Sequence, residues 1–275
     1  MEEQLKPRPS GSKLAYIPGA EPLLRIDPWW GLVAVVVGLV ILLVTVSPDP
    51  FWNIVRFVRD GITITILITV ISFLFILVVG MLGGLGRLSQ NWFIHGAATL
   101  YVEVVRGIPL LVQLLAWYFA FPVIVQWIGQ ELHIQVLANY QANAIFTAIM
   151  GLAVCYGAYM SEIYRAGIQS IPKGQTEAAR SLGMTHLQSL RYVILPQAVR
   201  VVLPPVGNEF IALLKDSSLV SVVAVADLTR RGREFMAVHF NPIEVWAMVA
   251  LLYLVLTLFS ARVVAWVEKK TRFER

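Results

Sequence analysis

The chain has 275 residues, of which 57% are hydrophobic and only 14% are charged. Soluble domains carry about 25% charged residues, so this composition excludes an ordinary soluble domain and indicates an integral membrane protein. The net charge of +5 would also suit a nucleic-acid-binding protein. In so apolar a chain, an excess of Lys and Arg on the cytoplasmic side is the simpler explanation. The single cysteine, Cys155, excludes an internal disulfide and a cysteine-based metal site.

The amino-terminal region divides into a polar tail and a first apolar block. Residues 1–28 are polar and rich in proline, and no small-residue cleavage site follows the apolar block. We therefore expect a cytoplasmic tail rather than a signal peptide. Residues 29–58 predict an extra transmembrane helix, 29–46, and a loop that contains an amphipathic piece. Trp29 and Trp30 are suited to the membrane interface.

The second predicted span, residues 61–86, ends in the glycine-rich sequence GMLGGLG. No strand precedes these glycines and their spacing does not fit a dinucleotide-binding fingerprint. Small residues in a membrane helix instead let a neighbouring helix approach closely. We expect this end of the span to pack tightly against another helix.

The third predicted span covers residues 108–128, with Pro109 and Pro122 bending or bounding it. Just before it, Glu103 and Arg106 are three positions apart, so they share a helix face and are expected to pair. An unpaired charge near the centre of a bilayer would cost roughly 2.5–3.5 kcal/mol. The pair is therefore expected near the surface or against protein.

The fourth predicted span covers residues 142–164 and follows a segment, 129–141, that has the profile of an outside loop because it lacks Lys and Arg. Glu162 and Arg165 near its end repeat the three-residue spacing of the earlier Glu–Arg pair. The repeat is too short to indicate an internal duplication.

A polar stretch then separates two apolar blocks and predicts a helix, a turn and a second helix. Thr176 is the expected N-cap of the first helix. Gly183 can end that helix in the left-handed conformation, and Thr185 with Gln188 forms a capping box for the second. Pro196 is expected to mark where the second helix ends. Basic residues place this hairpin on the cytoplasmic side: Lys173, Arg180, Arg191 and Arg200.

The fifth predicted span, residues 201–214, is interrupted by Pro204 and Pro205 and carries Asn208 and Glu209 at membrane depth. Polar residues inside a membrane segment indicate a transport path by default. The run Lys215–Asp216–Ser217–Ser218 that follows is interpreted as a local structural junction, and lining of the path is its alternative role.

Residues 217–226 form an apolar stretch too short to cross a membrane, which suggests a re-entrant segment. The next residues include Arg230, Arg231 and Arg233, which face outside on this topology, against the positive-inside tendency. Residues 243–267 predict the last span, and a basic tail, 269–275, is expected inside. The chain is thus expected to be all-α, with about six transmembrane helices and both termini in the cytoplasm.

The hairpin resembles the EAA loop of ATP-binding-cassette importer permeases. The flanking sequences GAYMSEIYRAGIQSIPKGQ, PPVGNEFIALLKDSSLVSV and YVEVVRGIPLLVQ resemble the polar amino acid subfamily, and the resemblance covers residues 60–268. Valine at position 193 is a conservative departure from the usual isoleucine. The EAA loop, 176–196, carries the matching residues Glu177, Ala178, Ala179, Gly183, Val193, Leu195 and Pro196.

The resemblance implies a type I importer fold in which residues 59–268 form the permease domain and the hairpin couples to an ATPase. Except for Val193, the matching residues above would make that contact. It further implies two ATPase subunits that bind ATP and Mg²⁺, so that this chain needs no cofactor of its own. The other implied partners are an extracytoplasmic amino acid binding protein and a second permease, identical or homologous, in a bacterial plasma membrane. Neither the resemblance nor the residues indicate a nucleic-acid partner.

Evidence for catalysis within the chain is lacking. The sequence contains no Walker A motif and no His-Glu-x-x-His motif, and its four histidines are scattered. We therefore expect a transport subunit without catalytic or metal-binding residues. The hypothesis for the substrate path rests on four polar residues whose alternative role is hydrogen bonding between helices: Tyr159, Glu162, Asn208 and Glu209. A secondary transporter or channel that works without an ATPase remains the alternative.

Overall fold

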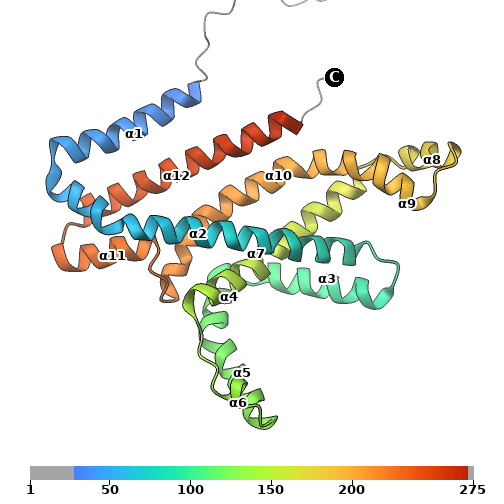
Figure 1. The fold of residues 1–275 in the computed structure, drawn as a ribbon, viewed down its shortest axis with the longest axis horizontal. Coiled ribbons are helices and arrows are strands. Elements are labelled where there is room, and N and C mark those ends of the chain that lie inside the picture. The colour runs from blue at the N-terminus through green and yellow to red at the C-terminus, as the bar shows by residue number, and fades with distance from the viewer. Residues whose placement is uncertain (1–27, 272–275) are drawn as a thin grey trace, which may run out of the picture.

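The computed structural model describes residues 28–271, which form helices and short turns without a strand (Figure 1). The predicted amino-terminal tail and the last residues of the carboxyl-terminal tail lie outside this range. The long helices are α1 (Pro28–Val46), α2 (Pro48–Arg87), α3 (Trp92–Gly107), α7 (Ala144–Gln169), α10 (Leu195–Asp216), α11 (Leu228–His239) and α12 (Pro242–Thr271). The short ones are α4 (Leu110–Leu115), η1 (Ala116–Ala120), α5 (Phe121–Glu131), α6 (Gln135–Ala138), α8 (Lys173–Ser181), α9 (His186–Ser189), η2 (Leu190–Ile194) and η3 (Ser217–Val222).

Five helical segments are long and apolar enough to cross a membrane: α1, α2, residues 110–131, α7 and α12. The expectation of an all-α membrane protein is therefore confirmed. The remaining predicted span corresponds to α10, whose 22 residues would reach about 33 Å. Its prolines and polar residues make it less apolar than the other five, so a sixth crossing stays a prediction.

The connection predicted before residue 59 is present but short. Ser47 separates α1 from α2, and the backbone is non-helical again at Asp49 (φ -104°, ψ 116°), so a turn precedes the amphipathic piece as expected. Pro50 follows this kink, and a helix start tolerates proline because the first amides have no intrahelical partner. No proline follows Pro50 in α2, so the amphipathic piece continues into the apolar run without a further loop.

The prolines of the later helices also do not end them. A π-helical turn stands directly before Pro122 and another before Pro196, and in each the residue before the proline donates its N–H five positions back. The wider turn gives room for the proline ring, which in a regular α-helix clashes with the carbonyl four positions back. The predicted helix end at Pro196 is therefore wrong, and α10 also continues through Pro204 and Pro205.

Helix α2 lies against α7 along the core of the molecule. The buried residues of this core come from α2, α4, α7, α10 and the segment after it, among them Ile68, Ile76, Leu152, Met160, Leu213 and Val220. A Cβ atom on Gly83 would collide with Ser161 of α7, which confirms that the glycine-rich end of α2 serves close packing. The apolar stretch after α10 is buried in the same core, through Val220, Val223 and Val225.

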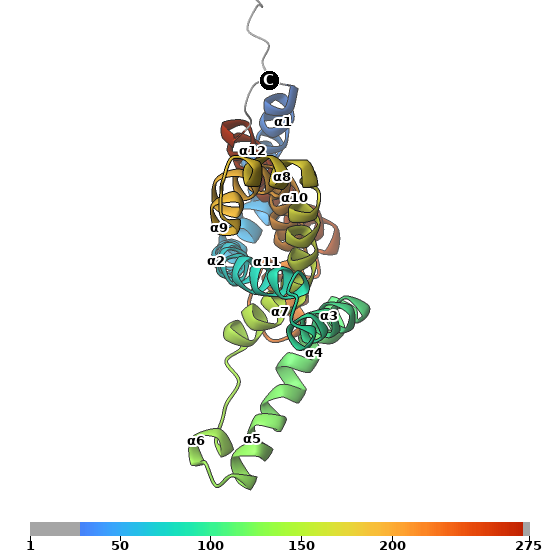
Figure 2. The same ribbon diagram turned by 90° about the vertical axis from the view of Figure 1, so that its right-hand side faces the viewer.

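The molecule has two distinct ends. Helices α8 and α9 lie at one end of the long axis, whereas α11 and the start of α2 lie at the other (Figure 1). α1 begins and α12 ends toward the side of α8 and α9. The α5–α6 arm projects away from the body in both views (Figure 2).

Candidate functional site

The hairpin of α8 and α9 is built by local bonds. Pro172 precedes α8, which begins at Lys173, so the prediction of Thr176 as N-cap is wrong. The residue before a proline avoids the helical conformation, which favours a helix start just after Pro172. Thr176 then lies inside the helix.

The turn of the hairpin confirms the remaining expectations. Gly183 has φ +78°, and the N–H groups of Gly183 and Met184 donate to the carbonyls of Arg180 and Ala179 at 2.9 and 3.1 Å. This is a Schellman motif, which needs a left-handed residue at that position. Thr185 and Gln188 form both bonds of the predicted capping box. The turn is thus fixed by residues within the hairpin.

The surface of the hairpin differs in part from the expected one. Glu177 and Ala178 are exposed, but Ala179 is only 3% exposed and packs within the chain. The side chain of Ala179 is therefore not free to make the direct ATPase contact that the resemblance implied. Leu182 and Leu187, which the sequence reading missed, are 80% and 72% exposed. Apolar residues in so polar a stretch were the available signal, because exposed apolar groups mark contact surfaces.

Leu195 and Pro196 are exposed at the start of α10, and they join the hairpin to that helix. A hydrogen bond of 3.2 Å between Gln197 and Gln175 ties α10 to α8. The hairpin therefore stands directly between α7, which precedes it, and α10, which follows it.

A cavity of about 250 Å³ lies between α7, α10 and α4. Tyr159 and Glu209, two of the four residues predicted for the substrate path, line it together with Leu110, Cys155, Tyr156 and Asp216. Glu209 and Asp216 are seven positions apart on α10, which is about two helical turns, so both carboxylates face the same side. For Asp216, this placement favours the alternative interpretation of the Lys215–Ser218 run, in which it lines the path.

One hydrogen bond closes the cavity wall. The hydroxyl of Tyr156 on α7 donates to Asp216 Oδ2 on α10 at 2.6 Å. The guanidinium of Arg106 lies 5.3 Å from the centre of the Tyr159 ring, a cation–π contact, although Arg106 does not line the cavity. The cavity thus offers carboxylates and phenol groups within a small volume, with a guanidinium beside one of its rings.

The chain is interrupted beside this cavity, between α3 and α4. The amide of Gln113 donates to the carbonyls of Val105 and Ile108 at 2.8 Å each, which satisfies backbone groups freed by the break. Pro109 starts α4, so its expected role as a boundary is confirmed. Non-helical backbone at membrane depth is tolerated where it is buried in protein or lines a cavity.

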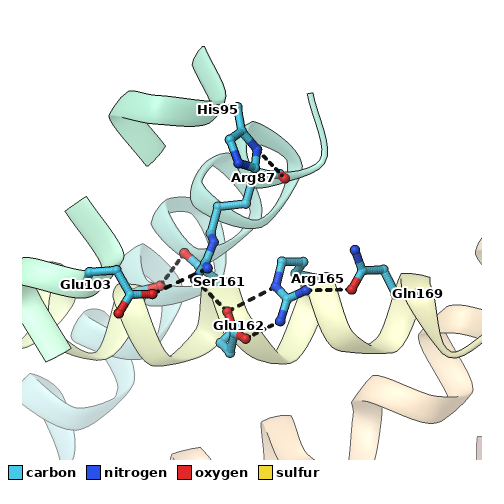
Figure 3. Close-up of polar contacts among 8 residues, drawn as sticks. Arg87, His95, Glu103, Ser161, Glu162, Arg165 and Gln169 are labelled. Carbon is cyan, nitrogen blue, oxygen red and sulfur yellow. Dashed lines mark hydrogen bonds and ion pairs between the residues drawn. The ribbon is translucent and has the colours of Figure 1, made fainter. Parts of the chain in front are cut away.

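Glu162 lies in a separate cluster at the end of α7 nearer the hairpin (Figure 3). It accepts a bond from Arg87 of α2 at 2.7 Å and pairs with Arg165, as the spacing predicted. The expected pair of Glu103 with Arg106 is wrong, because Glu103 lies 3.4 Å from Arg87 while Arg106 turns to Tyr159. The resulting cluster contains two positive and two negative side chains and joins the ends of α2, α3 and α7. Its members are Arg87, Glu103, Glu162 and Arg165.

Asn208 is exposed and does not line the cavity, although it stands next to Glu209 in sequence. Successive residues on a helix differ in direction by about 100°, so only one of the two faces inward. The structure therefore brings Tyr159 and Glu209 together and leaves Glu162 and Asn208 elsewhere. Their roles in transport stay predictions.

Comparison with known proteins identifies the family to which the sequence is similar. The profile of the binding-protein-dependent transport system inner membrane component family matches residues 76–273. The chain is 34% identical over 221 residues to the glutamine transport system permease protein GlnP of Escherichia coli, covering 80% of this chain and 95% of that one. It is 37% identical over 228 residues to the L-cystine transport system permease protein TcyB of Bacillus subtilis, covering 80% and 90%.

Solved structures agree. An amino acid ABC transporter crystallised with histidines has a chain that is 36% identical, with a TM-score of 0.68, covering 78% of this chain and 94% of that one. The inward-facing MetNI methionine ABC transporter shares the fold at 21% identity, with a TM-score of 0.59 and coverage of 82% and 99%.

Proposed function

Because this chain belongs to the family of binding-protein-dependent transport system inner membrane components, we propose that it is the permease subunit of an ATP-driven importer of a polar amino acid. The relatives named for glutamine and cystine support that substrate class. The observation that carries the proposal is that the exposed hairpin stands directly between α7 and α10, the two helices joined across the cavity.

The cavity has the chemistry that a zwitterion needs. Glu209 and Asp216 supply negative charge for the α-ammonium group, and Arg106, which contacts the Tyr159 ring, supplies positive charge for the α-carboxylate. Tyr156 and Tyr159 add phenol groups that can bond to a polar side chain. In low-dielectric surroundings such complementary charges offset the loss of hydration of the substrate.

The hairpin transmits the nucleotide-dependent closure of the ATPase subunits to the membrane helices. Glu177, Ala178, Leu182 and Leu187 insert into a groove between ATPase subunits, and closure of those subunits on nucleotide moves the groove. The helices α7 and α10 move with the hairpin, so the Tyr156–Asp216 bond between them opens in one state and closes in the other. Nucleotide then drives alternating access by favouring one of two arrangements.

The proposed assembly contains two ATPase subunits, a second permease of identical or homologous sequence, and an extracytoplasmic binding protein that delivers the amino acid. ATP and Mg²⁺ bind to the ATPase subunits, and this chain contributes no catalytic group. The hairpin contacts an ATPase, so its end of the molecule is cytoplasmic. α1 begins and α12 ends toward that same side, which supports cytoplasmic termini.

Reconstitution tests the proposal. The chain, purified from its native membrane with the proteins that accompany it, is placed in proteoliposomes with labelled glutamine, cystine, histidine or glutamate. We expect uptake of at least one of them only when ATP, Mg²⁺ and the binding protein are supplied on their respective sides. Uptake driven by an ion gradient without ATP would instead establish a secondary transporter.

A further inference from the structure

The end of the molecule opposite the hairpin carries an open hollow of about 580 Å³ between the start of α2 and α11. Aromatic rings from both helices line it. Phe57 meets Phe235 edge to face at 5.5 Å between ring centres, and Phe235 stacks on His239 at 4.0 Å. The rings hold α2 and α11 together beneath the hollow.

Arginines from both helices surround these rings. Within the described part of the chain, one of them is paired with carboxylates, and two are not. Arg231 is neutralised by Asp60 at 2.5 Å and by Glu234 at 2.8 Å. The side chains of Arg56 and Arg59 line the same hollow and have no hydrogen-bond or ion-pair partner within residues 28–271. They are three positions apart on α2, so they project toward the same side.

The position of these arginines is unusual for a membrane protein. The apolar run of α2 begins near Ile62, so Arg56 stands about 9 Å beyond it at 1.5 Å per residue. With the hairpin end in the cytoplasm, this end faces outward, where Lys and Arg are normally depleted. Arg231 is explained by its carboxylate partners in the chain, whereas Arg56 and Arg59 are not.

The surroundings of the hollow favour a protein surface as the occupant. His239 at the end of α11 lines the hollow, and next to it Phe240 in the turn is 84% exposed and Ile243 at the start of α12 is 80% exposed. Arginine and aromatic side chains together are the residues that dominate binding energy at protein interfaces. Unpaired cations select a partner with the opposite charge, because complementary charge steers the encounter and rejects other surfaces.

We propose that the hollow between α2 and α11 is a docking site for an acidic surface of the amino acid binding protein, with Arg56 and Arg59 as its charge-selective contacts. This inference rests on the proposed importer function, which supplies a partner on this side. The aromatic rings provide apolar contact area, and the two arginines set orientation and rate of association. Such contacts weaken as salt is raised, because exposed charges are screened.

The test uses the whole complex in lipid nanodiscs with the binding protein that supports uptake in the reconstitution above. The readout is the concentration of loaded binding protein that gives half-maximal stimulation of ATP hydrolysis, at 50 and 300 mM NaCl. In Arg56→Glu/Arg59→Glu we expect this concentration to rise roughly tenfold at low salt and to lose most of its salt dependence. Saturating binding protein should restore the maximal rate, because the hollow only docks.

The matched control is Lys269→Glu/Lys270→Glu at the opposite end of the molecule, which changes the net charge equally and should leave the half-maximal concentration within twofold. An unchanged concentration in the Arg56/Arg59 variant overturns the docking site while uptake itself still supports the importer. Absence of any stimulation in the unaltered complex would instead count against the proposed function. A variant that responds to the fraction of phosphatidylglycerol in the nanodisc, but not to binding protein, would assign the hollow to lipid headgroups and likewise overturn the proposal.

Discussion

In the hairpin, the bonds that shape the turn join residues at most six positions apart, whereas the cavity is closed by a bond between Tyr156 and Asp216, sixty positions apart. The hairpin therefore keeps its shape wherever its two ends are held, and it can transmit a movement as a rigid piece. The shape of the cavity depends on how α4, α7 and α10 are placed, because its walls come from these three separate helices. A transporter needs both properties, a stiff contact with its partner and a site that opens.

The largest effect is expected from a change that separates the helices and leaves the hairpin untouched. In Gly83→Val, the new side chain would collide with Ser161 on α7, and overpacking of this kind costs typically about 1–3 kcal/mol and sometimes more. We expect the folded fraction in detergent, measured by size-exclusion chromatography, to fall several-fold. Gly96→Val on α3, where a Cβ meets nothing within 4 Å, is the control. Equal profiles for the two variants would show that the α2–α7 contact does not limit folding.

A more local effect, on uptake and not on folding, is expected from the cavity itself. Removing the charge in Glu209→Gln or Asp216→Asn should lower kcat/KM for uptake roughly tenfold to a hundredfold, since hydrogen bonds to charged groups contribute about 1.5–3 kcal/mol. Asn208→Ala, next in sequence but outside the cavity, should stay within twofold. Unchanged uptake in Glu209→Gln would remove Glu209 from the path, and a loss in Asn208→Ala would place the path on the other face of α10.

The hairpin should respond mainly in coupling. In Gly183→Asp, a residue with a Cβ must adopt φ +78°, which costs about 1–2 kcal/mol and distorts the turn locally. We expect uptake to fall roughly tenfold per ATP hydrolysed, while the unfolding temperature falls by only a few degrees. Gly174→Asp on the same hairpin, where a Cβ has open space, is the matched control.

Glu177→Lys tests the contact without altering the backbone, because Glu177 is exposed within this chain. It should likewise lower the uptake per ATP hydrolysed, through loss of the charge that faces the ATPase. Normal transport in both Gly183→Asp and Glu177→Lys would refute the assignment of the coupling surface.

The smallest effect is expected at α11, which combines local and long-range ion pairs. Hydrogen bonds from Arg230 and Arg231 lower the pKa of Glu234 below its usual range. A lowered pKa stabilises the fold above the unfolded-state value of about 4.3 and loses this effect as pH falls through the folded-state value. Glu234→Gln should therefore lower the unfolding temperature slightly at pH 7 and make no difference in strong acid. Because the pair is partly exposed, a shift of a few degrees at most is expected.

Much of the hairpin could be predicted from the sequence because its bonds are local. The left-handed Gly183 and the Thr185–Gln188 capping box were both expected from residue type and spacing, and both are present. Thr176 failed as a cap because the competing signal of Pro172 starts the helix earlier. Residue type alone could not decide whether the helix starts after Pro172 or at Thr176.

The sequence by itself determined the class of protein, the apolar helices, the close packing of the glycine-rich end of α2, and the turn of the hairpin. Each of these follows from composition or from residues within a few positions of one another. The tertiary structure alone decided which carboxylates share a cavity, that Arg87 and not Arg106 pairs with Glu103, and that Ala179 is buried. These outcomes depend on how separate helices are rotated and placed, and that arrangement is set by packing over the whole chain.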